Sequence, residues 1–557
     1  MDSSLRLKPA NCRNCYKCIR SCPVKSIKFE NNQAHIIEKE CVLCGKCFVV
    51  CPQGAKEIRN DVAMVKKLID SGKPVIVSLA PSFIANYKGK TIKAMENALL
   101  KLGFAGVEET AIGASIVADE YDRIVGNNDQ DIVISTCCHS INLLIQKHYT
   151  DALPFVAKVT SPMLAHGKVI KENNKDAYVV FIGPCISKKD EIIQYPGIVD
   201  AVLTFEELTE WLKEENIEIT DDVDSKIKLK SRFFPTTGGI LKTMEKDNPN
   251  YTYLAVDGIG NCIAALEDII AGKLKNCFVE MSACNGSCIN GPAMDKNYRL
   301  PVSRYVDVSK YAGEDKTTHT LSKEQLAKTI SYKKSQDALP SEEKILEILH
   351  EMGKTNKNQE LNCGSCGYNT CREKAIAVYQ GKANLSMCLP FLKEKAESFS
   401  GNIVSHSPNG IIVVNDDLKI QLINQAACSI VNLHSANVCI GEHIVKIINP
   451  KPFIEVLYDN KKIKDERLYL AEYRKYVEMT IVHDKNYHIL ICIMRDITEE
   501  EKQKEKKVEI SQQTIEVTDK VIEKQMRIVQ EIASLLGETT AETKVALTKL
   551  KESLKDE

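Results

Sequence analysis

The sequence predicts a multidomain α/β protein, and three observations support this prediction. The chain has 557 residues, which at roughly 150 residues per domain leaves room for about three or four domains. Between residues 70 and 335, short β-rich runs alternate with helix-like runs, as is typical of parallel strands joined by crossover helices. The 22 cysteines fall largely into short repeated spacings, which indicates several small modules besides the α/β domain.

Composition and charge limit the partners that the protein can have. The chain has 74 basic and 75 acidic residues and a net charge of -1, so no electrostatic argument favours nucleic acid or an anionic membrane. No uninterrupted apolar run approaches the ~20 residues that cross a bilayer, and the N-terminus MDSSLRLKPANC runs directly into a cysteine motif. We therefore expect a cytoplasmic protein. In a reducing compartment thiols bind metals or react more often than they form disulfides.

The first predicted domain, residues 1–60, contains the spacing C-x2-C-x2-C-x3-C-P twice. The two copies comprise Cys12, Cys15, Cys18 and Cys22, and Cys41, Cys44, Cys47 and Cys51. This repeat resembles a bacterial ferredoxin with two clusters, in which the fourth cysteine of each copy binds the other cluster. The resemblance implies one [4Fe-4S] cluster on Cys12, Cys15, Cys18 and Cys51, and a second on Cys41, Cys44, Cys47 and Cys22. Zinc is the alternative, but zinc sites do not need a double pattern of eight thiols.

The second predicted domain, residues 70–335, has its unusual residues just after its strand-like runs. These runs include KPVIVSLA, DIVIS, AYVVFIG, DAVLTF and NCFVEM, and the helix-like runs include TIKAMENALLKLG, TEWLKEEN and AALEDIIAGKL. Sites in parallel sheets collect beyond the carboxyl ends of strands. The residues found there are Pro81-Ser82, Thr136-Cys137-Cys138, Pro184-Cys185 and the segment from Cys284 to Cys288. Such loops can supply four thiolates for another [4Fe-4S] cluster.

Three of these loops resemble the signatures of the [FeFe]-hydrogenase family, which read T-S-C-C-P, M-P-C-x-x-K-x-x-E and E-x-M-A-C-x-x-x-C. The resemblance covers roughly residues 1 to 300. It implies an H-cluster, in which a cubane is joined through one cysteine to a two-iron unit that carries carbon monoxide, cyanide and an azadithiolate bridge. It also implies that Cys138, Cys185, Cys284 and Cys288 hold the cubane, with Cys288 bridging to the two-iron unit.

The neighbouring cysteines in STCCHS are expected to differ in role, because successive side chains of an extended chain point to opposite faces. The family resemblance leaves Cys137 free as the proton donor beside the azadithiolate amine. A thiol with a reference pKa of ~8.5 can pass on a proton without being permanently ionised. The resemblance implies that the path continues through Glu191 and Ser161 to Glu120 near the surface.

Further residues are predicted to bind the cofactor. Cyanide ligands are anionic acceptors, so an ammonium group beside them supplies a charge-assisted hydrogen bond and orients the centre. The motif assigns this role to Lys188, which without that context would be interpreted as a surface lysine in SKKDE. Ser82, Pro184 and Ser187 are predicted to lie against the cofactor as well, the two serines as further donors.

Several positions depart from the family pattern. Gly183 and Ser282 stand where methionines are usual, and the other changes are His139, Ile141 and the short run Asn290-Gly291-Pro292. We expect these changes to remove soft, apolar packing from around the two-iron unit, which argues against fast hydrogen production. Similar methionine losses occur in sensory members of the family, but Cys137 is retained here.

His139 is interpreted as a hydrogen-bonded pocket residue, with metal ligation or proton transfer as the alternative. The remaining cysteines are predicted to be buried, inert thiols: Cys262, Cys277, Cys428, Cys439 and Cys492.

The third predicted domain, residues 340–395, carries four more cysteines in the spacing C-x2-C-x4-C-x16-C. They are Cys363, Cys366, Cys371 and Cys388, and Leu389-Pro390 follows the last of them. This pattern resembles the small iron-sulfur modules of redox proteins and implies one further [4Fe-4S] cluster. Zinc remains an alternative, because paired cysteines at this spacing also suit zinc.

The C-terminal third predicts an α+β domain and a helical tail. Residues 400–500, with SPNGIIVVNDDLKIQLINQAACSIV and later YHILICIMRDITEEE, resemble a PAS domain. No residues there specify haem or flavin, and His406, His434 and His443 are interpreted as ordinary surface or core residues. In residues 501–557, a solvated amphipathic helix and a short coiled coil both remain open. The apolar positions concerned are Val517, Val521, Ile528, Ile532 and Leu535. Gly537 and TTAET are expected to break the helix.

Together these features predict an oxidoreductase of the ferredoxin hydrogenase type, which interconverts H2 with protons and electrons. The expected partners are ferredoxin or a similar electron carrier, hydrogenase maturation proteins, a separate signalling protein, and a second copy of the chain bound through the PAS domain and tail. Two other functions stay open: a slow H2 or redox sensor, and a cluster-assembly relative that has the cubane but no two-iron unit. Retention of Cys137, Lys188 and Glu191 weighs against the assembly function.

Overall fold

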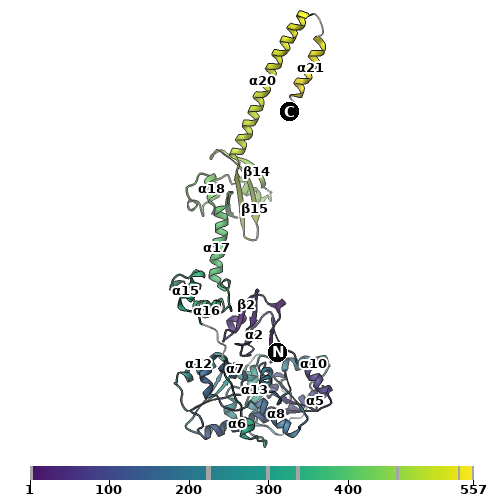
Figure 1. Cartoon of the computed structure of the whole chain (residues 1–557), viewed down its shortest axis with the longest axis vertical. Coiled ribbons are helices and arrows are strands. Elements are labelled where there is room, and N and C mark those ends of the chain that lie inside the picture. The colour runs from purple at the N-terminus through teal and green to yellow at the C-terminus, as the bar shows by residue number, and fades with distance from the viewer. Residues whose placement is uncertain are drawn as a thin grey trace. The chain divides into compact units, whose positions relative to one another are not determined.

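The protein divides into two compact units, Met1–Phe391 and Leu392–Glu557. The computed structural model describes residues 4–88, 90–220, 227–246, 248–295, 301–333, 339–459, 463–536 and 540–554. Figure 1 labels the helices and strands of both units. The predicted domain boundaries remain predictions.

The N-terminal segment of the first unit contains two local folds of the same kind, one for each cysteine copy. Its elements are β1 (Leu5–Leu7), α1 (Lys17–Ser21), β2 (Ile27–Glu30), β3 (Gln33–Ile36), α2 (Lys46–Val50) and β4 (Lys56–Ile58). β1 pairs with β4 and β2 pairs with β3, both antiparallel. The residue before each short helix is left-handed, with φ of 55° at Tyr16 and 70° at Gly45. A side chain at Gly45 would also collide with Pro292, so only glycine suits that position.

Two parallel sheets form the centre of the first unit, which confirms the predicted α/β domain. One has the strand order β6-β5-β8-β9 and the other β10-β11-β7. The strands are β5 (Val75–Leu79), β6 (Gly106–Glu109), β7 (Ile132–Ile134), β8 (Tyr178–Gly183), β9 (Ala201–Thr204), β10 (Thr252–Asp257) and β11 (Cys277–Ser282). The apolar runs did not predict β6 and β10. Both are edge strands and only partly buried, so they lack the continuous apolar runs of the central strands.

Helices pack against these sheets and bury their apolar faces in three large cores. They include α3 (Val62–Asp70), α4 (Phe83–Asn86), α5 (Ile92–Lys101), α6 (Ala111–Gly126), α7 (His139–His148), α8 (Pro162–Asn173), α9 (Lys188–Gln194), α10 (Phe205–Glu214), α11 (Gly239–Thr243), α12 (Ile259–Ile270), α13 (Pro301–Tyr311) and α14 (Lys323–Leu326). The three helix-like runs of the sequence fall on α5, α10 and α12. Thr204 starts α10 with a reciprocal capping box to Glu207, which fixes where that helix begins.

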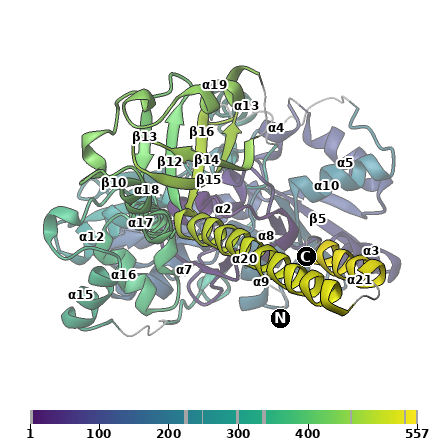
Figure 2. The ribbon, with the colours of Figure 1, turned by 90° about the horizontal axis from the view of Figure 1, so that it is seen from above.

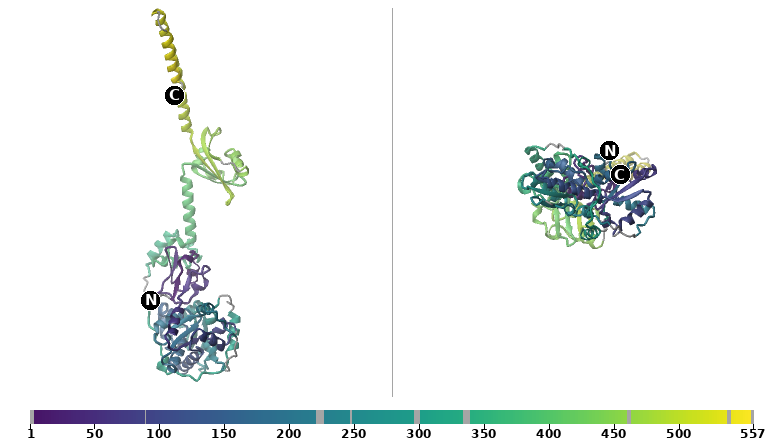
Figure 3. Two further views of the ribbon diagram at one scale, coloured as in Figure 1. Left: turned by 90° about the vertical axis from the view of Figure 1, so that its right-hand side faces the viewer. Right: turned by 90° about the horizontal axis from the view of Figure 1, so that it is seen from below.

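The cysteine module near the end of the first unit packs against the N-terminal segment. It contains α15 (Glu342–Glu351) and α16 (Cys371–Tyr379), and α17 (Leu389–His406) starts directly after Cys388. The backbone nitrogen of Phe29 donates to the carbonyl oxygen of Lys382 at 2.9 Å. In Figures 1 and 3 the purple N-terminal segment accordingly adjoins the teal segment with α15 and α16.

The second unit contains a five-stranded antiparallel sheet, which confirms the predicted α+β domain. Its strand order is β13-β12-β16-β15-β14. The elements are β12 (Gly410–Asn415), β13 (Ile420–Ile423), α18 (Gln425–Ile430), α19 (Lys451–Tyr458), β14 (Ile463–Leu470), β15 (Lys475–Asp484) and β16 (Ile489–Asp496). Residues along β12 alternate between buried and partly exposed, so one face of the strand lines the core.

The C-terminal tail consists of α20 (Thr498–Leu536) and α21 (Thr540–Ser553), which contact each other and lie side by side in Figure 2. The break expected at TTAET was wrong, because residues 540–543 lie within α21, and Gly537 lies outside the described residues. Val517, Val521, Ile528 and Ile532 are exposed on α20, and the side chain of Leu535 lies outside the described part. No helix in the described ranges is both long and apolar enough to cross a membrane.

Candidate metal centre

The carboxyl ends of strands from both parallel sheets meet at one cavity of about 820 Å³. β5 and β8 of one sheet, and β7 and β11 of the other, each lead into a loop that lines it. The predicted site residues in its lining are Ser82, Cys137, Cys138, Pro184, Cys185, Lys188 and Cys288, whereas Ser187 and Cys284 are not among the residues that line it. Residues that are more than 200 positions apart thus share one cavity, as the parallel topology predicts.

The four predicted cubane ligands are neighbours in this cavity region. Cys138 and Cys185 follow β7 and β8, whereas Cys284 and Cys288 both follow β11. Burial raises the pKa of the Cys284 thiol, and the nearby sulfurs of Cys185, Cys138 and Cys288 raise it further. Like-charged groups have this effect only when they lie close together. Four thiolates so placed repel one another and are stabilised by a cationic metal centre.

Hydrogen-bond donors around the cavity fit a polar, anionic cofactor. The Ser82 hydroxyl oxygen is buried and has no hydrogen-bond partner among the described residues. Such a group costs free energy unless a bound molecule pairs with it. The Ser187 oxygen lies 3.1 Å from the Cys185 sulfur, so this serine instead contacts a predicted ligand. The Lys188 ammonium group also lines the cavity and donates to the Cys137 carbonyl oxygen at 3.2 Å.

The missing methionine at Gly183 is compensated by a neighbouring side chain. A Cβ atom at Gly183 would lie 2.7 Å from ring atoms of Phe181, so this ring fills the space next to the glycine. Phe181 lines the cavity together with Met163, Met281 and Phe234. The expectation that the substitutions remove apolar packing was therefore wrong at Gly183, because the strand places residues 181 and 183 on one face.

Cys137 has different neighbours from Cys138, as their predicted difference in role requires. The Cys137 sulfur lies 3.4 Å from the hydroxyl oxygen of Tyr121 on α6. Burial raises the pKa of the Cys137 thiol to about 12, although the Tyr121 hydrogen bond and Lys188 both act to lower it. The thiol is therefore protonated at neutral pH in these surroundings.

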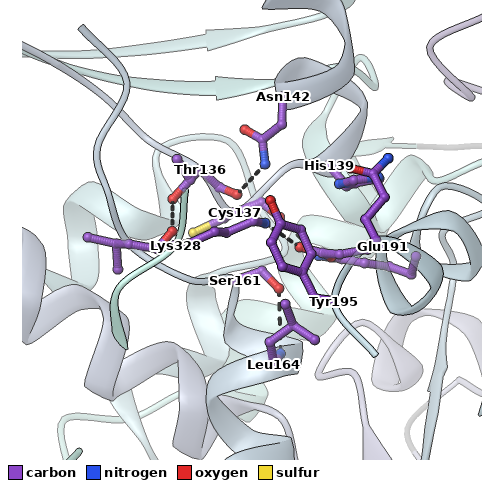
Figure 4. A network of polar contacts seen from close by, with 12 residues as sticks. Thr136, Cys137, His139, Asn142, Ser161, Leu164, Glu191, Tyr195 and Lys328 are labelled. Atoms are coloured by element: carbon purple, nitrogen blue, oxygen red, sulfur yellow. Dashed lines mark hydrogen bonds and ion pairs between the residues drawn. The ribbon is translucent and has the colours of Figure 1, made fainter. Parts of the chain in front are cut away.

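Glu191 is completely buried between two lysines. Its carboxylate accepts hydrogen bonds from Lys188 Nζ at 2.5 Å and Lys328 Nζ at 2.6 Å. Burial alone would raise the pKa of Glu191, but the two ammonium groups outweigh it and hold the pKa far below its usual range. Figure 4 shows Glu191, Lys328 and Tyr195 with Cys137, and the Lys328 ammonium group lies 4.6 Å from the centroid of the Tyr195 ring.

The remaining polar site residues have separate partners. Ser161 is buried at the start of α8, where its oxygen accepts a hydrogen bond from the Leu164 backbone nitrogen at 3.5 Å. Glu120 is held by Arg123, which donates two hydrogen bonds of 2.8 Å to its carboxylate. Within the described ranges, neither residue has a direct hydrogen bond to Cys137 or Glu191. Their roles in the proton path remain predictions.

His139 is a hydrogen-bonded pocket residue, as the sequence suggested. Its Nε2 atom shares a hydrogen bond of 2.7 Å with Asp190, and its side chain lines the cavity. Burial lowers the pKa of the imidazole, although Asp190 raises it.

The five cysteines without ligand spacing are all buried, as predicted. His406, His434 and His443 are exposed.

Three residues of the site were missed by the sequence analysis. Lys328 lies 137 positions from its partner Glu191, and no motif surrounds it. Tyr121 gave no signal because a buried tyrosine within a helix is usually part of the core. Glu280 lines the cavity and accepts hydrogen bonds from the backbone nitrogens of Gly238 and Ile240. It is the first residue of the third signature loop, so the motif could have identified it.

The other twelve predicted ligands surround three smaller cavities, with four cysteines in each. Cys12, Cys15, Cys18 and Cys51 line one of about 400 Å³, Cys22, Cys41, Cys44 and Cys47 one of about 330 Å³, and Cys363, Cys366, Cys371 and Cys388 one of about 360 Å³. These sets have the predicted membership, including the exchange of Cys22 and Cys51 between the two copies. In the described part of the chain, no three His, Cys, Asp or Glu side chains are arranged to hold a single metal ion.

Family comparisons agree with this arrangement. Residues 73–292 match the family model of the iron only hydrogenase large subunit, C-terminal domain. Residues 11–55 match a 4Fe-4S dicluster domain, and residues 359–390 match a model for an Fe-S cluster segment.

Curated relatives are distant. The chain is 25% identical over 358 residues to the periplasmic [Fe] hydrogenase large subunit of Nitratidesulfovibrio vulgaris, which covers 52% of this chain and 85% of that protein. It is 25% identical over 335 residues to the NADP-reducing hydrogenase subunit HndD of Solidesulfovibrio fructosivorans, covering 47% of this chain and 57% of that one. It is also 25% identical over 214 residues to the cytosolic Fe-S cluster assembly factor NAR1 of Vanderwaltozyma polyspora, covering 35% and 39%.

Solved structures give weaker likenesses. A variant of the [FeFe]-hydrogenase HydA1 from Chlamydomonas reinhardtii matches 46% of this chain and 91% of its own, with 17% identity and a TM-score of 0.39. The PAS domain of nitrogen regulation protein NR(II) from Vibrio parahaemolyticus matches 18% of this chain and 97% of its own, with 17% identity and a TM-score of 0.15. Residues 73–292 thus match the model of the iron only hydrogenase large subunit, between the matches to a 4Fe-4S dicluster domain and to an Fe-S cluster model.

Proposed function

We propose that the protein is a hydrogenase that interconverts H2 with protons and electrons at an H-cluster. One observation carries this proposal: three cysteines from three strand ends line a cavity, with Cys284 beside them, and the same cavity is lined by a further thiol, a buried ammonium group and an unpaired serine hydroxyl. When bound, an H-cluster supplies the iron chemistry for splitting or forming H2. The residues of the chain position the cofactor, exclude water from it and transfer protons.

The proposed ligand set is Cys138, Cys185, Cys284 and Cys288, with Cys288 also holding the two-iron unit. Lys188 and Ser82 would donate hydrogen bonds to anionic groups of the cofactor and Pro184 would limit its position, while Ser187 would contact the ligand Cys185. Apolar side chains such as Phe181 and Met163 exclude water from the rest of the cavity.

Cys137 would move the proton between the cofactor and the interior of the protein. Because burial keeps its thiol protonated, it can donate a proton and be reprotonated by a connected group. Glu191, fixed by Lys188 and Lys328, is the next buried titratable group, followed by Ser161 and then Glu120 nearer the surface.

The other three cysteine sets would each hold a [4Fe-4S] cluster that passes single electrons. Ferredoxin or a similar one-electron carrier is the proposed redox partner, and hydrogenase maturation proteins would insert the two-iron unit. We also propose a cytoplasmic location.

Infrared spectroscopy of the protein matured with its two-iron unit tests this function. We expect bands from metal-bound carbon monoxide and cyanide, together with exchange between H2 and D2O. Cys137→Ala should leave the bands in place but reduce turnover nearly to zero, because only the proton donor is lost. Cys262→Ala, which removes a buried thiol outside the cavity lining, is the matched control and should keep activity. Absence of diatomic bands from protein with a full iron content would contradict the proposal and favour the cluster-assembly function.

A sensor is the second candidate function, favoured by the direct connection between the last cysteine module and the second unit. Cys388 is followed at once by α17, which leads into the PAS-like sheet. In this case the H2 site turns over slowly, and the second unit binds a signalling protein or a second copy of the chain. Turnover measured with ferredoxin and with a redox dye separates the two functions: rapid turnover with both favours the enzyme, and slow turnover with both favours the sensor.

A further inference from the structure

The second cysteine set, comprising Cys22, Cys41, Cys44 and Cys47, adjoins the metal centre. Cys44 and the proposed ligand Cys138 pack against the same buried apolar core. Next to Cys44, a Cβ atom at Gly45 would lie 2.5 Å from Pro292 and 2.9 Å from Ile186, both in loops of the hydrogenase domain. This set therefore connects the metal centre with the other cysteine sets.

The first set, comprising Cys12, Cys15, Cys18 and Cys51, contacts the second one through Lys56. The buried Lys56 ammonium group donates to the Ala34 carbonyl oxygen at 2.5 Å. Lys56 also lines the cavity of the first set. Cys18, Cys22 and Cys47 also pack in a single buried cluster.

The third set, comprising Cys363, Cys366, Cys371 and Cys388, also contacts the second one, through the loop that contains Gly367. Lys25 Nζ donates to the Gly367 carbonyl oxygen at 2.6 Å. Cys22 is buried in a cluster against which Cys366 packs, and Lys25 Nζ lies 5.9 Å from the centroid of the Tyr368 ring. The contact is tight, because a Cβ atom at Gly367 would lie only 2.7 Å from the Cγ2 atom of Ile19.

Exposure distinguishes the second set from the other two. Cys15 of the first set and Cys363 of the third set are exposed. In the second set, Cys22, Cys41 and Cys47 are at most 9% exposed, and Cys44 packs against the same core as Cys138. The first and third sets thus each have a cysteine at the surface, whereas the second set is more deeply buried.

We propose that the second cysteine set is a branch point, from which electrons pass either to the first set or to the third set. This inference rests on the proposed function, because it requires a cubane in every set. Each H2 releases two electrons, which pass singly through the second set. An electron that moves to the third set reduces the cubane there by one electron, and the cubane of the second set is reoxidised. An electron that moves to the first set continues to a one-electron carrier at Cys15.

The branch assigns a purpose to the third set. In a linear order, its centre would lie beyond the first set and would serve only to extend the conduit. As a side branch it shares the redox state of the second set without lying on the path to the carrier. Its last ligand, Cys388, precedes α17, so its reduction occurs at the start of the helix that leads to the second unit.

Electron paramagnetic resonance of the full chain tests the contact between the second and third sets. The protein is reconstituted with cubanes only, without the two-iron unit, and reduced with dithionite, so that no hydrogenase activity is needed. We expect the signal of the third-set cubane to be broadened by spin coupling to a neighbouring cubane. Gly367→Ala should weaken this coupling without loss of iron, because the new Cβ atom forces the loop away from Ile19.

Gly381→Ala is the matched control. Gly381 has φ of 69° and Gly367 has φ of 98°, so both substitutions strain a left-handed position in the same module, but a Cβ atom at Gly381 meets nothing within 4 Å. The control should keep the coupling. Equal coupling in the two variants would overturn the assignment of this contact.

A second pair of variants distinguishes the branch from a linear order. Cys12→Ala/Cys15→Ala removes the cubane of the first set, and Cys41→Ala/Cys44→Ala removes that of the second. In a branch, only loss of the second cubane removes the coupling of the third. If loss of the first cubane removes it instead, the order is linear and the inference fails while the proposed function stands. If the unsubstituted chain binds no cubane at the third set, the cluster content of the proposed function fails, and the inference fails with it.

Discussion

The hydroxyl oxygen of Tyr121 lies 3.4 Å from the sulfur of Cys137 and accepts a hydrogen bond of 2.9 Å from the Thr136 backbone nitrogen. The phenol therefore fixes both the loop that carries the proposed proton donor and the donor itself. The ring packs edge to face on Phe278, with 5.2 Å between centroids, which holds it in place.

Tyr121→Phe should loosen the loop that carries Cys137 without removing any proposed ligand. We expect a loss of about 1–3 kcal/mol in the free energy of unfolding, because the Thr136 backbone nitrogen is left buried and unpaired. The Tyr121 hydrogen bond acts to lower the pKa of Cys137, so its removal should move the alkaline limb of the H2/D2O exchange profile to higher pH. Tyr253→Phe, which also alters a tyrosine packed near Phe278, is the control and should leave the profile unchanged.

Glu191→Gln should destabilise the protein strongly. The substitution leaves Lys188 and Lys328 buried without a charged partner, which typically costs about 3–5 kcal/mol. Thermal unfolding should show a clear decrease in Tm. Glu120→Gln is the control, because its partner Arg123 is partly exposed and such a pair contributes at most about 1 kcal/mol. Similar decreases in both variants would contradict a special role for the buried pair of lysines.

Stability in acid should depend on Glu191. Its pKa is far below normal in the folded protein, so its contribution is fully present above the unfolded pKa of ~4.3 and is lost as the pH falls toward the folded value. Unfolding measured across this acid range should therefore be less dependent on pH in Glu191→Gln than in the unsubstituted chain. An unchanged pH dependence would mean that the carboxylate does not carry this effect.

Ionisation of Glu280 should destabilise the folded protein as the pH rises, whereas ionisation of Glu191 stabilises it. Burial raises its pKa to about 7, although backbone nitrogens of Leu241, Gly238 and Ile240 donate to it and lower the pKa. Because the unfolded pKa is ~4.3, the free energy of unfolding should fall by on the order of 3 kcal/mol as the pH rises from about 4 to 7. Glu280→Gln should remove this decrease and be more stable than the unsubstituted chain at pH 8. A variant that is less stable at pH 8 would show that the ionised carboxylate is tolerated.

Substitutions at Phe181 and Gly183 should have non-additive effects on the stability of the protein. Gly183→Met restores the usual family residue but collides with the Phe181 ring, so it should cost about 1–3 kcal/mol by overpacking. Adding Phe181→Ala makes room for the methionine, and the double variant should be more stable than the sum of the two single effects predicts. Thermal unfolding of the three variants measures this coupling. Additive effects would mean that the two side chains do not compete for the same space.

The sequence by itself determined the cysteine sets and the class of fold. Fixed spacings specified which thiols come from one loop, and the resemblance to two-cluster ferredoxins implied the crossing of Cys22 and Cys51. Buried strands were recognised because parallel strands are covered on both faces and therefore have continuous apolar runs. The polar edge strands β6 and β10 lack that signal.

The tertiary structure decided which residues surround the predicted ligands. Lys328 reaches Glu191, Tyr121 reaches Cys137, and the Phe181 ring occupies the space beside Gly183. Local motifs record neighbours in the chain, whereas these contacts depend on how separate helices and strands pack together. Burial, which sets the pKa values of Glu191 and Glu280, is likewise a property of the packed interior and cannot be obtained from residue type alone.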